Sequence, residues 1–353
     1  MDLKGIIALS NTYGKDPELV LAGGGNTSVK DSKTLYVKCS GTSLKTIDEK
    51  GFVPVDRALL SETLKKPYPA DDRGREAAFL KDMMAARTIP GETRRPSVEA
   101  LLHNLFPQRY VLHLHPALVN GLTCGRAGES RLRELFGKKA LWIPLVRPGF
   151  VLGKTCCSLM DRHRAERGAE AQLVFLENHG IFIAADTAEE AGAILEDVMA
   201  TLKAAVTHFP DVPKQSAADS TLLEEICSKT GYTHVQFFTS PQILDYLQSP
   251  ESAQDLMLPF TPDQIVYCGA EPTYITEIPQ LEQSALRGKI LLIERMGMFA
   301  LGQTEKEAEL AALLFLDAFK IAIYAKSFGG VQPLTQDMIQ FIVTWEAESY
   351  RQK

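Results

Sequence analysis

Hydrophobic and polar positions along the chain follow two periods, that of an α-helix and that of a β-strand. Apolar residues recur at helical spacing over residues 3–13 and again over residues 73–87. Between such segments lie short β-rich runs that alternate with period two, as at residues 34–38 and 110–115. We therefore expect an α/β protein whose central sheet is mainly antiparallel and flanked by helices.

A strand, turn, strand and helix pattern occurs twice. Two strands are expected at residues 173–176 and 181–184, joined by "ENHG", and "ADTAEEA" then opens a long capped helix. The stretch "LENHGIFIAADTAEEA" aligns without gaps onto "IERMGMFALGQTEKEA", 117 residues further on. We expect a partial internal repeat, in which Met296 replaces His179. The alternative is an accidental match between two units of a common kind.

Composition and length indicate an ordinary globular protein with two domains. The chain has 353 residues, of which 45% are hydrophobic and 23% charged. A polar, proline-containing stretch, "PDVPKQSAADS", is the best linker candidate. We expect a catalytic domain over residues 1–212 and a smaller C-terminal subdomain over residues 213–353, which partly repeats the first without metal ligands.

Charge and cysteine content restrict the possible partners and compartments. The formal net charge is −6 and no run of lysine or arginine offers a stripe for phosphates, so a nucleic-acid binder is not expected. The start of the chain predicts a first helix and not a signal peptide, so we expect a cytoplasmic protein without a membrane partner. Six cysteines without a CxxC pair indicate reduced thiols, which makes cysteine-ligated zinc unexpected.

Three of the seven histidines fall in two apolar segments, "YVLHLHP" and "FLENHG". Residues two apart in a strand share a face, so His113 and His115 project side by side. Two such imidazoles crowd each other unless a cation between them accepts both lone pairs. His179 supplies a third nitrogen from a glycine turn, and three protein ligands with an open position are the pattern of catalytic zinc. For each histidine alone, the alternative is a hydrogen-bonded core residue.

A carboxylate is expected beside this cluster. Ser97 is predicted to cap a helix over residues 98–104, which places Glu99 in the first turn, just before the strand of the two histidines. From there Glu99 would reach the open side of the metal as a ligand or as a general base. Alternatively, Glu99 compensates the helix dipole and has no chemical role.

Three short loops of small and polar residues suit an anion. The glycine-rich "GGGNTS" is neither a Walker motif nor a GxGxxG motif, but its open backbone N–H groups suit a phosphate. The alternative is a flexible turn. "CSGTS" and "RRPS" are two further groups of the same kind. The candidate residues in these loops are Gly25, Asn26, Ser40, Gly41 and Ser97. Three such loops and a metal imply a small phosphorylated substrate.

Together these motifs resemble the class II aldolase/adducin family. "GGGNTS", "CSG", "PSVE", "HLHP" and "ENHG" occur in the order of that family over residues 20–200. "GGGNTSVK", "PSVEALLH" and "FGGVQPLT…FIVTWEAESYR" look most like the aldolase portion of bifunctional rhamnulose-1-phosphate aldolase/dehydrogenase proteins. The resemblance implies a mainly antiparallel sheet with helices on both faces. It also implies a homo-oligomer, commonly a tetramer, or a smaller assembly if the C-terminal half covers the contact surface.

The resemblance carries over to individual positions. The zinc-binding histidines of the family match His113, His115 and His179, and another divalent metal would fit the same ligands. Glu99 matches the catalytic acid and base of the family. The positions that hold the substrate phosphate match Asn26, Ser40, Gly41 and Ser97. Val98 stands where some members have a second serine, which removes one hydroxyl.

The implied activity is that of a class II, zinc-dependent aldehyde-lyase. It would cleave a ketose 1-phosphate of the rhamnulose or fuculose type to dihydroxyacetone phosphate and an aldehyde, through a metal-stabilised enediolate. Three alternatives remain open: a sugar-phosphate epimerase or dehydratase on the same metal, a non-enzymatic adducin-like interaction protein, and a structural metal site. The retained histidines and glutamate weigh against the adducin-like protein, and structural zinc usually has four protein ligands.

Overall fold

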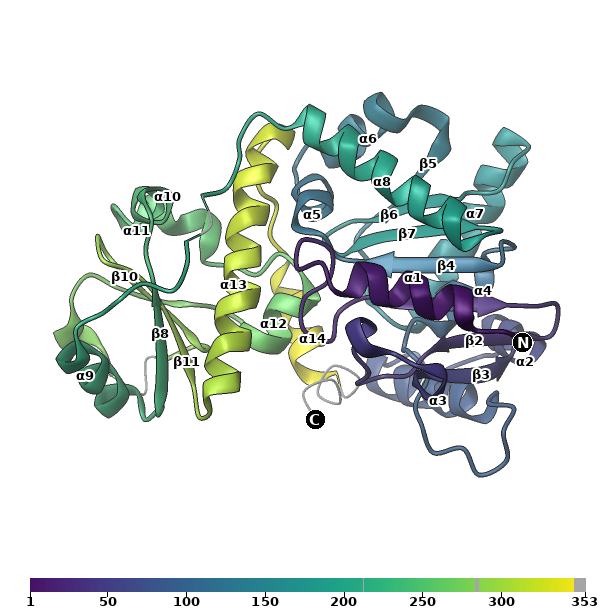
Figure 1. Cartoon of the computed structure of the whole chain (residues 1–353), viewed down its shortest axis with the longest axis horizontal. Coiled ribbons are helices and arrows are strands. Elements are labelled where there is room, and N and C mark those ends of the chain that lie inside the picture. The colour runs from purple at the N-terminus through teal and green to yellow at the C-terminus, as the bar shows by residue number, and fades with distance from the viewer. Residues whose placement is uncertain (212, 283–285, 346–353) are drawn as a thin grey trace.

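The computed structural model describes residues 1–211, 213–282 and 286–345. It contains two sheets, which stand on either side of the long helix α13 (Glu305–Ala325) (Figure 1). The end of the "WEAESYR" motif lies outside the described residues. The chain is thus an α/β protein with a large sheet and a smaller, C-terminal one.

The larger sheet has seven strands and is mainly antiparallel, as expected. Its strands are β1 (Asn26–Lys30), β2 (Thr34–Lys38), β3 (Phe52–Asp56), β4 (Tyr110–Leu114), β5 (Ala140–Ile143), β6 (Leu173–Leu176) and β7 (Gly180–Ala185). They follow the order β3-β2-β1-β4-β7-β6-β5. Only β5 and β6 pair in parallel among these described strands.

Helices cover both faces of this sheet (Figure 1). They are α1 (Lys4–Gly14), α2 (Arg57–Glu62), α3 (Asp72–Ala85), α4 (Ala100–Leu105), α5 (Ala117–Thr123), α6 (Gly128–Phe136), α7 (Phe150–Arg167) and α8 (Ala188–Ala205). Leu112 of β4 packs in the cluster that holds side chains of α1 and α8. Val111 packs in the other cluster, with side chains of α4 and α7. Because strand side chains alternate, the face under α4 is also the face of His113.

The helices and strands expected from periodicity are confirmed with small shifts of their bounds. The helices expected at residues 3–13 and 73–87 are α1 and α3, and the strand at residues 34–38 is β2. The long capped helix is α8, whose N-cap Thr187 accepts a hydrogen bond from the backbone N–H of Glu190. Local pattern therefore predicted these elements well.

Two local predictions were wrong. The helix expected at residues 98–104 begins at Ala100, so Glu99 is its N-cap residue and does not lie in the first turn. A turn precedes it, because the Glu99 N–H donates to Ser97 Oγ and the Ala100 N–H donates to the Ser97 carbonyl. The glycine-rich loop ends at Gly25, since the residues from Asn26 onward belong to β1.

The smaller sheet repeats part of the larger one. Its strands are β8 (His234–Phe238), β9 (Thr273–Ile275), β10 (Ile290–Ile293) and β11 (Gly297–Gly302), in the order β8-β11-β10-β9. β8 and β10 flank β11 antiparallel, and β9 pairs with β10 in parallel. The strands β4-β7-β6-β5 have the same order and the same directions. The predicted partial repeat is confirmed.

We call β4, β5, β6, β7 and α8 the first unit, and β8, β9, β10, β11 and α13 the second unit. The turns between their last two strands have the same backbone: Asn178 has φ of 56° and Arg295 has φ of 53°. Thr187 and Thr304 cap the helices that follow in the same way. The resemblance thus extends from strand order to single residues.

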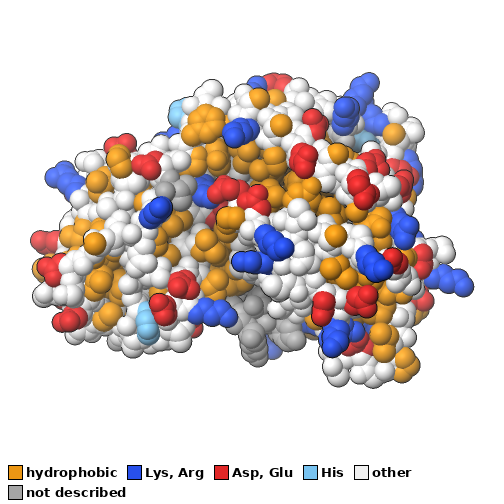
Figure 2. All heavy atoms as spheres, viewed as in Figure 1, with side chains coloured by type: hydrophobic (Ala, Val, Ile, Leu, Met, Phe, Trp, Pro, Cys, Tyr) orange, Lys and Arg blue, Asp and Glu red, His pale blue; other side chains and the backbone are white. Residues whose placement is uncertain are grey.

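The remaining helices lie around the second unit and between the sheets. They are α9 (Ser220–Thr230), α10 (Pro241–Tyr246), α11 (Pro250–Ala253), α12 (Pro262–Cys268) and α14 (Gln336–Thr344). All residues of α12 are buried, and α12 lies close to α13 and α14 at the junction of the sheets (Figure 1). No helix among the described residues is long and apolar enough to cross a membrane. On the face in Figure 2, acidic and basic side chains are interspersed.

Candidate metal centre

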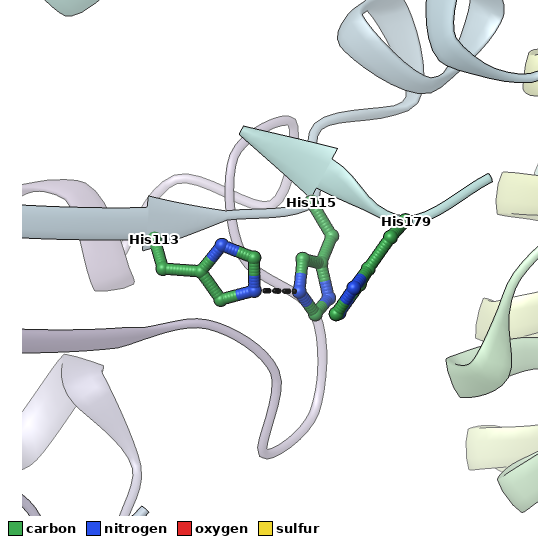
Figure 3. Close-up of side chains that lie close together, drawn as sticks. All are labelled: His113, His115 and His179. Atoms are coloured by element: carbon green, nitrogen blue, oxygen red, sulfur yellow. Dashed lines mark hydrogen bonds between the residues drawn. The ribbon is translucent and has the colours of Figure 1, made fainter. Parts of the chain in front are cut away.

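The three histidines singled out in the sequence converge on one point (Figure 3). His113 lies in β4, His115 follows the end of that strand, and His179 lies in the turn between β6 and β7. The Nε2 atoms of His113 and His115 are 2.8 Å apart. One nitrogen of each ring lies within 4.8 Å of the others, a geometry in which three side chains could hold a metal ion.

Glycine allows the His179 turn to approach β4 closely. A Cβ atom on Gly180 would lie 2.5 Å from the Leu114 carbonyl oxygen and 2.7 Å from Cδ2 of His115. Both distances are shorter than van der Waals contact, so a side chain there would push the turn away. The glycine beside His179 therefore has a structural reason tied to the cluster.

Hydrogen bonds fix the orientation of two of the rings. Nδ1 of His113 lies 3.0 Å from the Ile181 carbonyl oxygen, and Nδ1 of His115 lies 2.6 Å from Oδ2 of Asp263. Carbonyl and carboxylate oxygens only accept, so in the neutral rings both Nδ1 atoms carry the hydrogen. The two Nε2 lone pairs then face each other across the centre, an arrangement that suits a shared cation.

Burial keeps the rings ready to bind a cation. Burial lowers the pKa of His179 to about 3 and also lowers the pKa of His113. Metal ions bind the neutral imidazole, so no proton has to be removed from these nitrogens at neutral pH.

Glu99 adds a buried carboxylate to the same centre. Its Oε1 lies 3.1 Å from Nε2 of His113 and 3.5 Å from Nε2 of His179, and it accepts no hydrogen bond from the described residues. Burial raises the pKa of Glu99, but its interaction with the neighbouring imidazoles, above all His113, outweighs this and holds the pKa well below its usual range. A cation would stabilise a buried carboxylate that lies among neutral imidazoles. Three imidazoles and one carboxylate are also a donor set of divalent metal sites.

A hydrogen-bonded chain holds Glu99 in place. The amide of Asn26 donates to Oε2 of Glu99 over 2.7 Å and accepts from Nε2 of His103. Nδ1 of His103 in turn accepts from the Ser28 hydroxyl at 2.7 Å. Burial lowers the pKa of His103 well below its usual value, so this ring is neutral and its tautomer is fixed. The amide of Asn26 thus bonds both Glu99 and His103, and its expected role in holding an anion stays a prediction.

The other two predicted anion loops, "CSGTS" and "RRPS", lie side by side near the metal ligands. The Ser40 N–H donates to the Arg95 carbonyl over 2.8 Å, and the Ser97 N–H donates to the Lys38 carbonyl over 2.9 Å. A cavity of about 50 Å³ opens here. Its lining includes the predicted residues Gly25, Asn26, Ser40, Gly41, Ser97, Glu99, His115 and His179. His113 is fully buried and lies behind this lining.

Sequence reasoning missed four residues that line or support the centre. Lys38 of β2 lines the cavity, and its Nζ donates to the Gly23 carbonyl over 3.3 Å. Tyr267 of α12 and Trp345, which follows α14, line it from the C-terminal part of the chain. Asp263 contacts His115. The alternation of β2 contains Lys38, and Trp345 lies in the "FIVTWEAESYR" motif, but no local signal marks Tyr267 or Asp263.

Comparison with known proteins gives a family match over the larger sheet. Residues 5–206 match the family model described as "Class II Aldolase and Adducin N-terminal domain". A relative from Bacillus subtilis (strain 168), called "Uncharacterized oxidoreductase YuxG", is 28% identical over 193 residues. That alignment covers 52% of this chain and 26% of the relative, so the chain matches about a quarter of the length of that protein.

Two solved structures each resemble more than half of the chain. The N-terminal class II aldolase domain of a conserved protein from Thermoplasma acidophilum is 27% identical, with a TM-score of 0.49. The similarity covers 58% of this chain and 93% of that one. The L-fuculose-1-phosphate aldolase from Thermus thermophilus is 16% identical, with a TM-score of 0.37, over 57% of this chain and 94% of that one.

Proposed function

The chain belongs to the class II aldolase and adducin family, and we propose that it is a metal-dependent aldolase acting on a ketose 1-phosphate. The products are dihydroxyacetone phosphate and an aldehyde, and rhamnulose 1-phosphate and fuculose 1-phosphate are the first substrates to test. The observation that carries the proposal is the convergence of three imidazoles and one buried carboxylate on a single point beside a cavity.

The residues that would hold the metal are His113, His115 and His179, and zinc fits this donor set. A bound divalent ion supplies Lewis-acid polarisation of a substrate carbonyl and stabilises the negative charge that develops when the adjacent carbon–carbon bond breaks. The protein contributes fixed ring orientations, since the Ile181 carbonyl and Asp263 determine which nitrogens face inward. It also buries the centre, because His113 is fully buried and Glu99 nearly so.

Glu99 is the acid and base in this proposal. Its Oε2 is held by Asn26, whereas Oε1 accepts no hydrogen bond from the described residues and points to the centre. A carboxylate held at one oxygen and open at the other can accept a proton from a substrate carbon or hydroxyl and return it without moving far. His103 and Asn26 keep it in that orientation.

The anionic end of the substrate binds on the other side of the cavity. Ser40, Gly41 and Ser97 present small side chains and backbone there, beside the ammonium group of Lys38. Lys38 supplies a positive charge to the cavity that Val98 also lines, whereas a second serine in the "PSVE" motif would have supplied a hydroxyl. One small substrate could therefore place its phosphate here and still reach the metal ligands, because both sets of residues line the same cavity.

We also propose that residues 1–212 form the catalytic domain and residues 213–353 a C-terminal subdomain that repeats its topology without the metal ligands. The stretch around residues 206–219, residue 212 aside, has neither helix nor strand, which supports a boundary there. The assembly is a homo-oligomer, with fewer subunits than four if the second unit covers a contact surface. Native mass measurement tests this part.

A coupled assay for dihydroxyacetone phosphate tests the activity. Purified protein is incubated with a panel of ketose 1-phosphates, with and without a chelator. The proposal predicts release from at least one member of the panel and loss of that release after chelation, with recovery on adding zinc. A blank panel from protein that binds metal would contradict the aldolase and favour an epimerase or dehydratase on the same ligands.

A further inference from the structure

The metal centre receives support from the part of the chain that lies outside the family match. Asp263 is at the start of α12, beyond residue 206, where the match ends. Its Oδ2 lies 2.6 Å from Nδ1 of His115, although the two residues are 148 positions apart. We propose that Asp263 is a positioning residue for His115, an inference that rests on the metal site of the proposed function.

The contact has the geometry of a strong, charge-assisted hydrogen bond. Both side chains are largely buried, with 13% of His115 and 11% of Asp263 exposed, so water weakens the interaction little. A carboxylate can only accept, and it therefore holds the hydrogen on Nδ1 and leaves the Nε2 lone pair directed at the centre. A carboxylate behind a ligating imidazole also raises its basicity and so its affinity for a metal.

The segment that carries Asp263 is itself firmly held. Thr261 caps α12 by accepting from the Gln264 N–H, and Pro262 occupies the first helical position. The Gln264 side chain accepts from the Phe260 N–H at 2.9 Å. These local bonds stabilise the start of α12, from which Asp263 reaches His115.

The same segment also holds the neighbour of a second ligand. The Asn178 side chain, next to His179, donates to the carbonyls of Phe260 and Gln332 over 3.0 and 2.8 Å. Residues 260–263 thus contact one ligand directly and anchor the turn of another. The C-terminal part of the chain thus contacts the His115 imidazole and holds the turn that carries His179, even though it supplies no ligand itself.

Zinc affinity is the property that separates positioning from simple structural support. We would measure it by competition with a chromophoric chelator for the whole chain and three variants, Asp263→Ala, Asp263→Asn and Thr261→Ala. Loss of an outer partner of a ligating histidine is expected to weaken zinc binding about 10- to 100-fold in Asp263→Ala. Asp263→Asn keeps an acceptor without the charge, so it should fall between Asp263→Ala and the unmodified protein.

Thr261→Ala is the matched control, because it weakens the cap of the same helix without touching His115. It should lower the thermal stability but, because the Asp263 carboxylate that contacts His115 is retained, weaken zinc binding far less than either Asp263 variant does. Cobalt provides a second readout: the visible spectrum of the bound ion should change clearly more in the Asp263 variants than in Thr261→Ala. If Asp263→Ala does not fold, Asp263→Asn carries the test.

The outcomes distinguish this inference from the proposed function. Unmodified protein that binds no zinc would overturn both. Tight binding by the unmodified protein, with equal affinity and an unchanged cobalt spectrum in the folded Asp263 variants, would overturn only the role of Asp263. Equal losses of affinity in Thr261→Ala and Asp263→Asn would also overturn it, since helix stability alone would then explain the effect.

Discussion

The first and second units share a fold but differ at the positions that face the metal centre. The strand pairing places Phe237 against Phe299 as it places His113 against Phe182. By the same register, Thr239 stands in the place of His115, and Met296 stands in the place of His179. Both units keep the strand order, the turn and the helix cap.

This difference separates what the fold needs from what the chemistry needs. Both units have a stacked pair of rings at this position, although His113 in the first unit is replaced by Phe237 in the second. The ring centroids are 4.0 Å apart for His113 and Phe182, and 4.6 Å apart for Phe237 and Phe299. The turn survives without its histidine. A strand and a turn of this kind therefore form without imidazoles, and the three histidines of the first unit call for a chemical explanation.

The largest effect is expected when the first unit is given a residue of the second. His113→Phe should keep the stacking on Phe182 and the fold, but remove one of three metal ligands. We expect dihydroxyacetone phosphate release to fall to background, with a circular dichroism spectrum like that of the unmodified protein. Activity near the original level would show that the two units differ for a reason other than chemistry.

Glu99→Gln is expected to have the next largest effect. The amide can still accept from Asn26 but cannot take up a proton, so turnover should fall by about 10²- to 10⁴-fold while zinc stays bound. Glu294→Gln in the second unit, which alters a bond to Tyr274, is the control and should leave turnover unchanged. Similar rates for Glu99→Gln and Glu294→Gln would assign Glu99 a structural role.

The two turns should respond differently to glycine. Asn178→Gly removes two donors and leaves two carbonyls without them, which should lower the free energy of unfolding by roughly 1–3 kcal/mol. Arg295 is exposed and has a positive φ, which glycine adopts without strain. Arg295→Gly should therefore change the free energy of unfolding by less than about 1 kcal/mol. Denaturant unfolding of the metal-free proteins provides the comparison, and equal losses would contradict it.

Acid should destabilise the metal-free protein through the first unit. The pKa of His179 is about 3 in the folded state, below the ordinary value, so the unfolded chain binds more protons below about pH 6.5. The contribution of His179 to stability should be constant above that pH and fall below it, by at most about 1.4 kcal/mol per pH unit. His179→Met, which copies the second unit, should make the fall shallower; parallel curves would refute this assignment.

The sequence predicted the parts of the site that have a local signature. The HxH spacing of His113 and His115, the turn of His179 and the carboxylate of Glu99 were all visible in short motifs, and the structure brings them together. The sheet followed from periodicity, and the repeat followed from the alignment of two stretches of the sequence. Local patterns report these features because side-chain direction in a strand or turn depends on the nearest neighbours.

The missed features depend on contacts between distant segments. Asp263 reaches His115 through the packing of α12 at the junction of the sheets, which no local pattern encodes. The hydrogen bonds of Asn26 with Glu99 and His103 were not predicted, because they depend on the position of Asn26 in β1, which turns its amide toward Glu99. Helix α4 began later than predicted because the Ser97 hydroxyl stabilises a turn before it.

Metal content tests the central claim most directly. Unmodified protein and His179→Met are purified in parallel, equilibrated with zinc, freed of excess metal and analysed for zinc per folded chain. The account predicts close to one equivalent in the unmodified protein and none in the variant, in which both units carry methionine at the turn. No zinc in the unmodified protein, or equal zinc in both, would contradict it.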